Sequence, residues 1–184
     1  MKLRTIALVA AALAAPVLSA QEGPRFGLQA GLNLPQADLK DAVDSKVGLN
    51  IGAHLALDLR GGHMLRPRVD YTWFPEYTMS DFGASASVKF SSLALGADYL
   101  YFPAGKPEGL YFTGGLGLVQ WKAESSASYL GTSVSNSETT TKLGLAIGAG
   151  YQFNQTVGAE VRYQTSKAWE GTLDTIQVGV TFKF

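Results

Sequence analysis

Apolar residues occupy every second position along most of the chain after residue 24. In the last segment, the alternate positions are held by Ile176, Val178, Val180, Phe182 and Phe184. A period of two is typical of β-strands, because successive side chains of a strand point to opposite faces. Since no sustained apolar spacing of helical period follows the first 20 residues, the pattern predicts an all-β protein.

The alternation recurs in eight segments, each nine to fourteen residues long. They are residues 25–34, 47–60, 65–73, 91–102, 109–121, 142–153, 157–165 and 175–184. The fifth is the least certain in register, because Gly114, Gly115 and Gly117 blur the difference between its two faces.

The connections between these segments alternate in length. The long ones are residues 35–46, 75–87, 123–140 and 166–174, and the short ones are 60–63, 103–109 and 154–156. This regularity predicts an up-and-down meander whose two ends lie in different environments, with both chain termini at the end of the short turns.

The apolar faces indicate a membrane barrel. A strand that crosses a bilayer needs roughly 9–11 tilted residues with alternate ones facing lipid. A water-soluble barrel would instead carry charges on its outer face, whereas here the polar side is mostly Gly, Ala, Ser, Asn and Gln. Hydrocarbon offers no hydrogen-bond partners, so the last strand must pair with the first. We therefore predict an eight-stranded antiparallel up-and-down transmembrane β-barrel.

Aromatic residues gather at both ends of the predicted strands. Tyr99, Tyr101, Tyr151, Phe153, Phe182 and Phe184 lie beside the short turns, and Trp73, Tyr163 and Trp121 lie nearer the long connections. Two aromatic belts of this kind flank the apolar band of outer-membrane barrels. A general preference of aromatic residues for strands is the alternative explanation.

Residues 1–20 resemble a signal peptide, with Lys2 and Arg4 ahead of an apolar run. Cleavage after Ala20 would leave a barrel domain of residues 21–184, and cleavage after Ser19 is an alternative. A retained anchor is disfavoured, because the run is shorter than the roughly 20 residues that a spanning helix needs.

Charge and composition exclude several kinds of function. The chain has 15 basic and 15 acidic residues, so it gives no reason to expect a nucleic-acid partner. It contains no cysteine, which excludes disulfides, a thiol nucleophile and thiolate metal ligands.

Charged residues also occur on the predicted inward faces. They are Asp58, Arg66, Arg68, Asp70, Asp98, Glu160, Arg162 and Lys183, four acids and four bases. Charges in so narrow a lumen are tolerable only when they are paired and hydrogen-bonded. We expect a closed ionic network that blocks ion flow. The alternative is solvation at the periplasmic rim, and it applies most strongly to Lys183 and Asp58.

Enzymatic chemistry finds little support in the sequence. The two histidines, His54 and His63, fit a strand interior and a tight turn, and neither belongs to a Ser-His-acid pattern. Two isolated histidines also make a poor metal site. We expect no catalytic residues, no cofactor and no metal.

The chain resembles the small eight-stranded OmpA/OmpX-type outer-membrane β-barrel superfamily. The segments that carry the resemblance are "FGLQAGLNL", "LRPRVDYTW" and "GLAIGAGYQFNQTVGAEVRYQ". In addition, the alternation that ends on Phe184 is similar to the C-terminal signature that the barrel-assembly machinery reads in bacterial outer-membrane proteins.

The resemblance implies a monomer in the bacterial outer membrane, surrounded by phospholipid and lipopolysaccharide. It leaves three functions open. A structural or surface-interaction role in envelope integrity or adhesion, through the long extracellular loops, is favoured. A channel for small solutes or hydrophobic molecules comes second, and a lipid-A-modifying enzyme comes third. The sequence does not identify a ligand for the loops.

Overall fold

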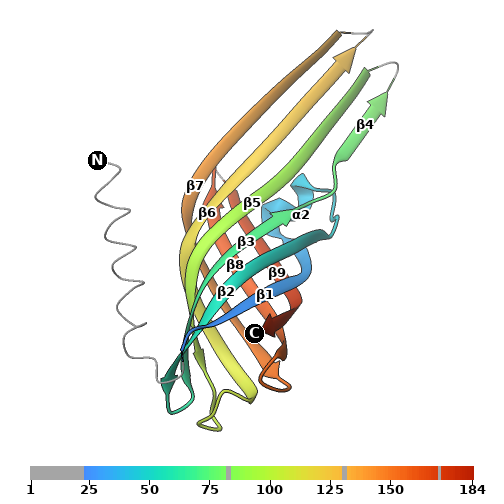
Figure 1. Cartoon of the computed structure of the whole chain (residues 1–184). Helices are drawn as coiled ribbons and strands as arrows, with labels where there is room; N and C mark the ends of the chain where they lie inside the picture. The colour runs from blue at the N-terminus through green and yellow to red at the C-terminus, as the bar shows by residue number, and fades with distance from the viewer. Residues whose placement is uncertain (1–22, 82–83, 130–131, 170) are drawn as a thin grey trace, which may run out of the picture.

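The computed structural model describes residues 23–81, 84–129, 132–169 and 171–184 (Figure 1). The predicted signal peptide, residues 1–20, lies outside these residues. The elements in chain order are β1 (Arg25–Gln36), α2 (Ala37–Ala42), β2 (Gly48–Arg60), β3 (His63–Trp73), β4 (Tyr77–Asp81), β5 (Ala84–Tyr101), β6 (Gly109–Tyr129), β7 (Thr132–Gln152), β8 (Val157–Ala168) and β9 (Gly171–Lys183). Within the described ranges, no helix has the length and apolar character to cross a membrane.

Eight of these strands form a closed antiparallel ring. Neighbours in the ring pair in chain order, and β1 pairs with β9. β3 pairs directly with β5, and the short strand β4 follows β3 along the same edge of β5. The β1–β9 seam extends to the backbone N–H of Phe184, which donates a hydrogen bond to the carbonyl of Phe26 at 2.8 Å. The predicted eight-stranded antiparallel barrel is confirmed.

The two faces of the ring differ as the alternation predicts. Outward side chains include Ile51, Leu95, Leu116 and Ile147, which are between 52% and 67% exposed. Inward positions instead carry buried glutamine, asparagine, threonine and charged side chains. A continuous exposed apolar surface of this kind is expected where lipid replaces water as the solvent.

The long connections are the main departure from the predicted layout. We expected open loops at residues 75–87 and 123–140, but these residues contain β4, the first part of β5 and a hairpin of β6 and β7. Figure 1 shows β4, β5, β6 and β7 rising together beyond the rest of the ring. We call this extension the arm: β4 with residues 84–91 of β5, 122–129 of β6 and 132–142 of β7.

The other two long connections are also more regular than expected. Residues 35–46 contain the end of β1 and the helix α2, which is only six residues long and therefore too short to produce a helical period in the sequence. Residues 166–174 belong largely to β8 and β9, which pair as far as Ala168 and Gly171.

Two apolar clusters fill the ends of the barrel interior. At the arm end, Leu39 and Val43 of the α2 segment pack with Phe74, Val119, Trp121, Ala168 and Leu173. At the short-turn end, the cluster is Ala56, Met64, Leu100, Phe102 and Tyr111.

The prediction that Trp121 belongs to an outer aromatic belt is wrong. Its side chain points inward, is 1% exposed, and donates a hydrogen bond from Nε1 to Ser166 Oγ at 2.8 Å. This placement also resolves the uncertain register of residues 109–121.

Candidate functional site

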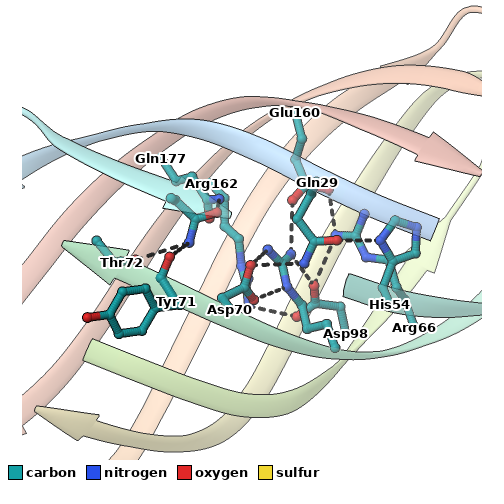
Figure 2. Close-up of polar contacts among 12 residues, drawn as sticks. Gln29, His54, Arg66, Asp70, Tyr71, Thr72, Asp98, Glu160, Arg162 and Gln177 are labelled. Carbon is teal, nitrogen blue, oxygen red and sulfur yellow. Dashed lines mark hydrogen bonds and ion pairs between the residues drawn. The ribbon is translucent and has the colours of Figure 1, made fainter. Parts of the chain in front are cut away.

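Between the two apolar clusters, six of the eight predicted interior charges come together. Three arginines and three acids project from β3, β5 and β8 into the lumen (Figure 2). We call them the charge cluster: Arg66, Arg68, Asp70, Asp98, Glu160 and Arg162. Each is at most 7% exposed, and the formal charges sum to zero.

Asp98 is the centre of this cluster. Its Oδ2 atom accepts hydrogen bonds from Arg66 Nη2 and Arg68 Nη1, both at 2.9 Å, and its Oδ1 accepts from Arg162 Nη2 at 2.8 Å. One carboxylate of β5 therefore joins two arginines of β3 to one arginine of β8.

Glu160 completes the connection between β3 and β8. Its carboxylate accepts from Arg66 Nη2 at 2.6 Å, from Arg68 Nη1 at 3.4 Å and from the Tyr111 hydroxyl at 2.9 Å. Removing one partner from such a buried set leaves an uncompensated charge, which typically destabilises a protein by about 3–5 kcal/mol.

Glycine gives the charge cluster its space. A Cβ atom added at Gly115 would lie 1.9 Å from Asp98 Oδ1, and one added at Gly150 would lie 2.3 Å from the Tyr111 ring. Glycine within these strands therefore allows bulky charged and aromatic side chains to cross a narrow lumen.

Neutral side chains that the sequence did not single out extend the network. Gln29 Nε2 donates to Asp70 Oδ1 at 2.9 Å, and Gln29 Oε1 lies within hydrogen-bond reach of His54 Nδ1. His54 is 3% exposed, so its predicted place on an inward strand face agrees with the structure. In the sequence, these residues are marked only by their alternate positions on the lumen-facing side of a strand, and many other polar residues of the chain share such positions.

A second polar layer lies beside Tyr71 of β3. Thr72 Oγ1 accepts hydrogen bonds from Asn33 Nδ2 at 2.8 Å and from Asn50 Nδ2 at 3.0 Å, while Gln177 Nε2 donates to Asn50 Oδ1 at 2.6 Å. These residues belong to β1, β2, β3 and β9, so the layer connects β3 to three strands that supply none of the six members of the charge cluster.

The two remaining predicted charges lie apart from the charge cluster. Asp58 is partly exposed at the short-turn rim, where its Oδ1 accepts the Arg60 backbone N–H at 2.8 Å. Lys183 borders a cavity of about 230 Å³ at the same mouth, together with Asp58 and Met64. Asp58 therefore fits the alternative of a position at the rim, whereas Lys183 is only 7% exposed and stays inside the ring, at the level of Gly27 and His54.

The interior has little room for a solute. Two cavities border the charge cluster, with volumes of about 20 Å³ and about 10 Å³. A cavity needs roughly 10–15 Å³ to hold one water molecule. Among the described residues, no group of three His, Asp or Glu side chains is arranged to bind a metal ion. Side chains thus fill most of the lumen around the charge cluster.

The proposed assembly residues lie on the outward face of β9. Val178, Val180 and Phe182 are between 40% and 44% exposed, Phe184 is 71% exposed, and Ile176 is partly buried. The Phe184 ring also stacks on Phe26, with centroids 6.5 Å apart. This placement leaves the face open to lipid or to a protein partner, and its recognition by the assembly machinery stays a prediction.

The arm is the second candidate site, and its two faces differ. On the face continuous with the lumen side, the registers place four apolar residues side by side across four strands: Met79, Ala86, Ala127 and Val134. Met79 is 59% exposed and Val134 is 68% exposed. The opposite face carries mainly serine and threonine, with Lys89, Lys122 and Glu124. An apolar row left in water is a common mark of an interaction surface.

The arm also has backbone groups without strand partners. Residues 144–152 of β7 pair with β8, whereas residues 132–143 pair with β6 alone. Within the described part of the chain, residues 132–143 therefore form one unpaired edge of the arm, and β4, which pairs with β5 alone, forms the other. Such an edge can accept a further strand.

Comparison with known proteins agrees with this architecture. Residues 5–184 match the family model described as outer membrane protein beta-barrel domain. Among solved structures, the attachment invasion locus protein Ail of Yersinia pestis is 15% identical with a TM-score of 0.61, and the match covers 88% of this chain and 97% of Ail.

Two further structures are similar over nearly the same length. Neisserial surface protein A is 19% identical with a TM-score of 0.52, covering 89% of this chain and 98% of that protein. The N-terminal barrel domain of Pseudomonas aeruginosa OprF is 16% identical with a TM-score of 0.51, covering 86% and 97%. At these identities the likeness concerns the fold alone. No curated protein sequence matches the chain.

Proposed function

The chain belongs to the outer membrane protein beta-barrel domain family and is an outer-membrane β-barrel protein; from this premise, we propose that it acts at the cell surface through the arm. The observation that carries the proposal is the exposed apolar row of Met79, Ala86, Ala127 and Val134 on a sheet that projects beyond the ring. The barrel then serves as a rigid membrane anchor for the arm.

The interior supports an anchoring role. Apolar clusters at both ends and a charge-neutral cluster between them leave cavities of about 20 Å³ or less beside the charges. A fixed plug stabilises the ring and gives a solute no continuous path. The placement of the two histidines favours a protein without enzymatic activity, because His54 contacts Gln29 and His63 contacts Tyr99.

The arm then binds a protein of the extracellular matrix or of the host-cell surface. An apolar row beside an unpaired strand edge suits an extended polypeptide, which would add main-chain hydrogen bonds to the edge and side chains to the row. Ail, which shares the fold, has been crystallised with the heparin analogue sucrose octasulfate. We also propose that residues 1–20 direct export, that the assembly machinery inserts the barrel, and that the protein works as a monomer.

Cell adhesion tests the proposal. Cells that display the wild-type protein should bind extracellular-matrix proteins or host cells more strongly than cells without it. The double variant Met79→Ser, Val134→Ser should lose this gain, whereas Thr78→Ala on the same strand should keep it. If the wild type and the double variant adhere equally at equal amounts of folded barrel, the apolar row has no part in adhesion. Membrane permeability and serum survival measured on the same cells would separate adhesion from a role in envelope integrity.

A further inference from the structure

The outward side chains of β5, β6 and β7 form rows that run across the three strands. Leu95, Leu118 and Leu143 make the last fully apolar row, and Leu93, Gln120 and Thr141 make the next. Above them, the rows are Ser91–Lys122–Thr139, Lys89–Glu124–Ser137, Ser87–Ser126–Ser135 and Ser85–Ser128–Ser133. We call these four rows the hydroxyl face. The registers of both strand pairs are unbroken, so this face continues the lipid-facing surface of the barrel.

The height of these rows determines what surrounds them. A strand tilted by about 45° rises about 2.4 Å per residue along the membrane normal. The ten residues from Leu118 to Ser128 therefore rise about 24 Å, while the headgroup zone of one leaflet is about 5–8 Å thick. The upper serine rows thus stand well above the lipid headgroups. In the outer leaflet of this membrane, the neighbouring molecules at that height are the saccharides of lipopolysaccharide.

The chemistry of the hydroxyl face suits such neighbours. Hydroxyls recur about 4.8 Å apart between strands and about 6.8 Å apart between rows. Each can donate and accept hydrogen bonds, as sugar hydroxyls also do. Ser87 Oγ and Ser126 Oγ lie 2.8 Å apart; Ser87 is partly exposed and Ser126 is exposed. A shallow groove of about 440 Å³ crosses these strands. Its lining combines Ser87, Lys89, Glu124, Ser126, Ser135 and Ser137 of the hydroxyl face with Glu76, Ser125 and Asn136.

Two lysines lie in the lower rows of the face, about 10 and 14 Å above the Leu118 row at the same rise per residue. Lys89 is directly opposite Glu124, and Lys122 forms an ion pair with Glu124. The hydrogen bond and the charge of Lys122 hold the pKa of Glu124 below its usual range, so the acid stays ionised. The face therefore carries two positive charges and one negative charge, an excess that favours a phosphate group.

We propose that the hydroxyl face packs against the phosphorylated core saccharide of lipopolysaccharide molecules in the same leaflet, with Lys89 and Lys122 binding phosphate. The contact fixes the orientation of the arm above the membrane. It uses the face opposite the apolar row and does not depend on the adhesive function, since an arm that binds no external partner would still make it.

Site-specific labelling tests this contact on the intact barrel, because the chain has no cysteine of its own. Ser126→Cys reports on the hydroxyl face, and its neighbour Ala127→Cys reports on the apolar face of the same strand. Each variant is reconstituted in nanodiscs of phospholipid alone, phospholipid with lipid A, or phospholipid with lipopolysaccharide that keeps its full core. Heat-modifiable migration on gels confirms that each variant is folded.

The full-core lipopolysaccharide should slow maleimide labelling of Ser126→Cys several-fold and leave Ala127→Cys nearly unchanged. Adding Lys89→Glu and Lys122→Glu should abolish most of that protection. Equal labelling of Ser126→Cys in all three discs would overturn the proposal. So would equal slowing at both positions, which indicates general crowding, or full protection by lipid A alone, which indicates that the core saccharide has no part.

Discussion

Arg68 and Asp70, two residues apart on β3, bind each other through two hydrogen bonds, from Nε to Oδ2 at 2.6 Å and from Nη2 to Oδ1 at 2.8 Å. Their spacing places both side chains on the inward face of one strand. Arg68 Nη1 remains available and donates to Asp98 on β5 at 2.9 Å. A pair formed within one strand thus becomes part of a connection between strands, which explains how charge stabilises the barrel from inside.

The charge cluster should respond unequally to the loss of its members. Glu160→Ala removes a carboxylate that accepts from Arg66, Arg68 and Tyr111, whereas Arg162→Ala removes only one ion pair, with Asp98. Both variants should fold, with a free energy of unfolding lower by about 3–5 kcal/mol for Glu160→Ala and less for Arg162→Ala. Urea titration in lipid vesicles, followed by heat-modifiable migration, measures the difference. Asp58→Ala at the rim is the control. If it lowers the free energy of unfolding as much as Glu160→Ala does, the charge cluster has no special role in stability.

The polar layer around Thr72 offers an independent test without charge. Thr72→Val removes the oxygen that accepts hydrogen bonds from Asn33 and Asn50 and leaves two buried amides short of a partner. The expected loss of unfolding free energy is about 1–3 kcal/mol. Thr141→Val, at an exposed position of β7, should change it little. The same urea titration decides, and an unchanged midpoint for Thr72→Val would show that the layer contributes nothing.

The alternation of residues was sufficient to predict the ring because lipid and a filled lumen impose opposite demands on adjacent residues. The arm could not be predicted in the same way. In most of residues 84–91, 122–129 and 132–142, no other described element of the chain covers either face, so burial within the protein imposes no alternation on the sequence. The Ser/Thr-rich composition of residues 123–140 therefore indicated a loop, although the backbone forms a continuous hairpin.

Six interior charges were predictable because they occupy the alternate positions that face the lumen. Alternation does not, however, indicate how far along the barrel axis a residue lies. Asp58 and Lys183 share the parity of the cluster and lie near the mouth, beside Met64. Trp121 shows the converse: its position near a strand end suggested a belt residue, and only the register across Gly114, Gly115 and Gly117 places it inside. The hydrogen-bond partners Gln29 and Tyr111 required knowledge of which strands face each other across the lumen.

Surface labelling tests the orientation of the barrel in cells. Ala127→Cys lies on the apolar face of the arm, and Lys106→Cys lies in the short turn between β5 and β6. A maleimide that cannot cross the membrane should label Ala127→Cys in intact cells and label Lys106→Cys only after the outer membrane is opened. The reverse pattern would place the arm in the periplasm and remove the basis for a surface function.

The terminal strand should matter more for assembly than for stability. Phe184→Ser removes the ring that stacks on Phe26 and leaves the backbone hydrogen bond between these residues possible. We expect the folded fraction in the outer membrane to fall several-fold, while barrel refolded in vitro keeps nearly the wild-type unfolding midpoint. Leu110→Ser, an exposed lipid-facing change on β6, is the matched control. If Phe184→Ser accumulates as folded barrel at the wild-type level in cells, recognition of the terminal pattern is refuted.

Ion conductance distinguishes a plugged anchor from a channel, because a filled lumen blocks current and an open one carries it. Purified wild-type barrel inserted in a planar bilayer should show no steady current, since the charge cluster and the two apolar clusters occupy the lumen. Insertion is verified independently by protease protection of the same vesicles before fusion. Steady ohmic single-channel conductance from the folded wild-type protein would contradict the plug and make transport of small solutes the better account of the barrel.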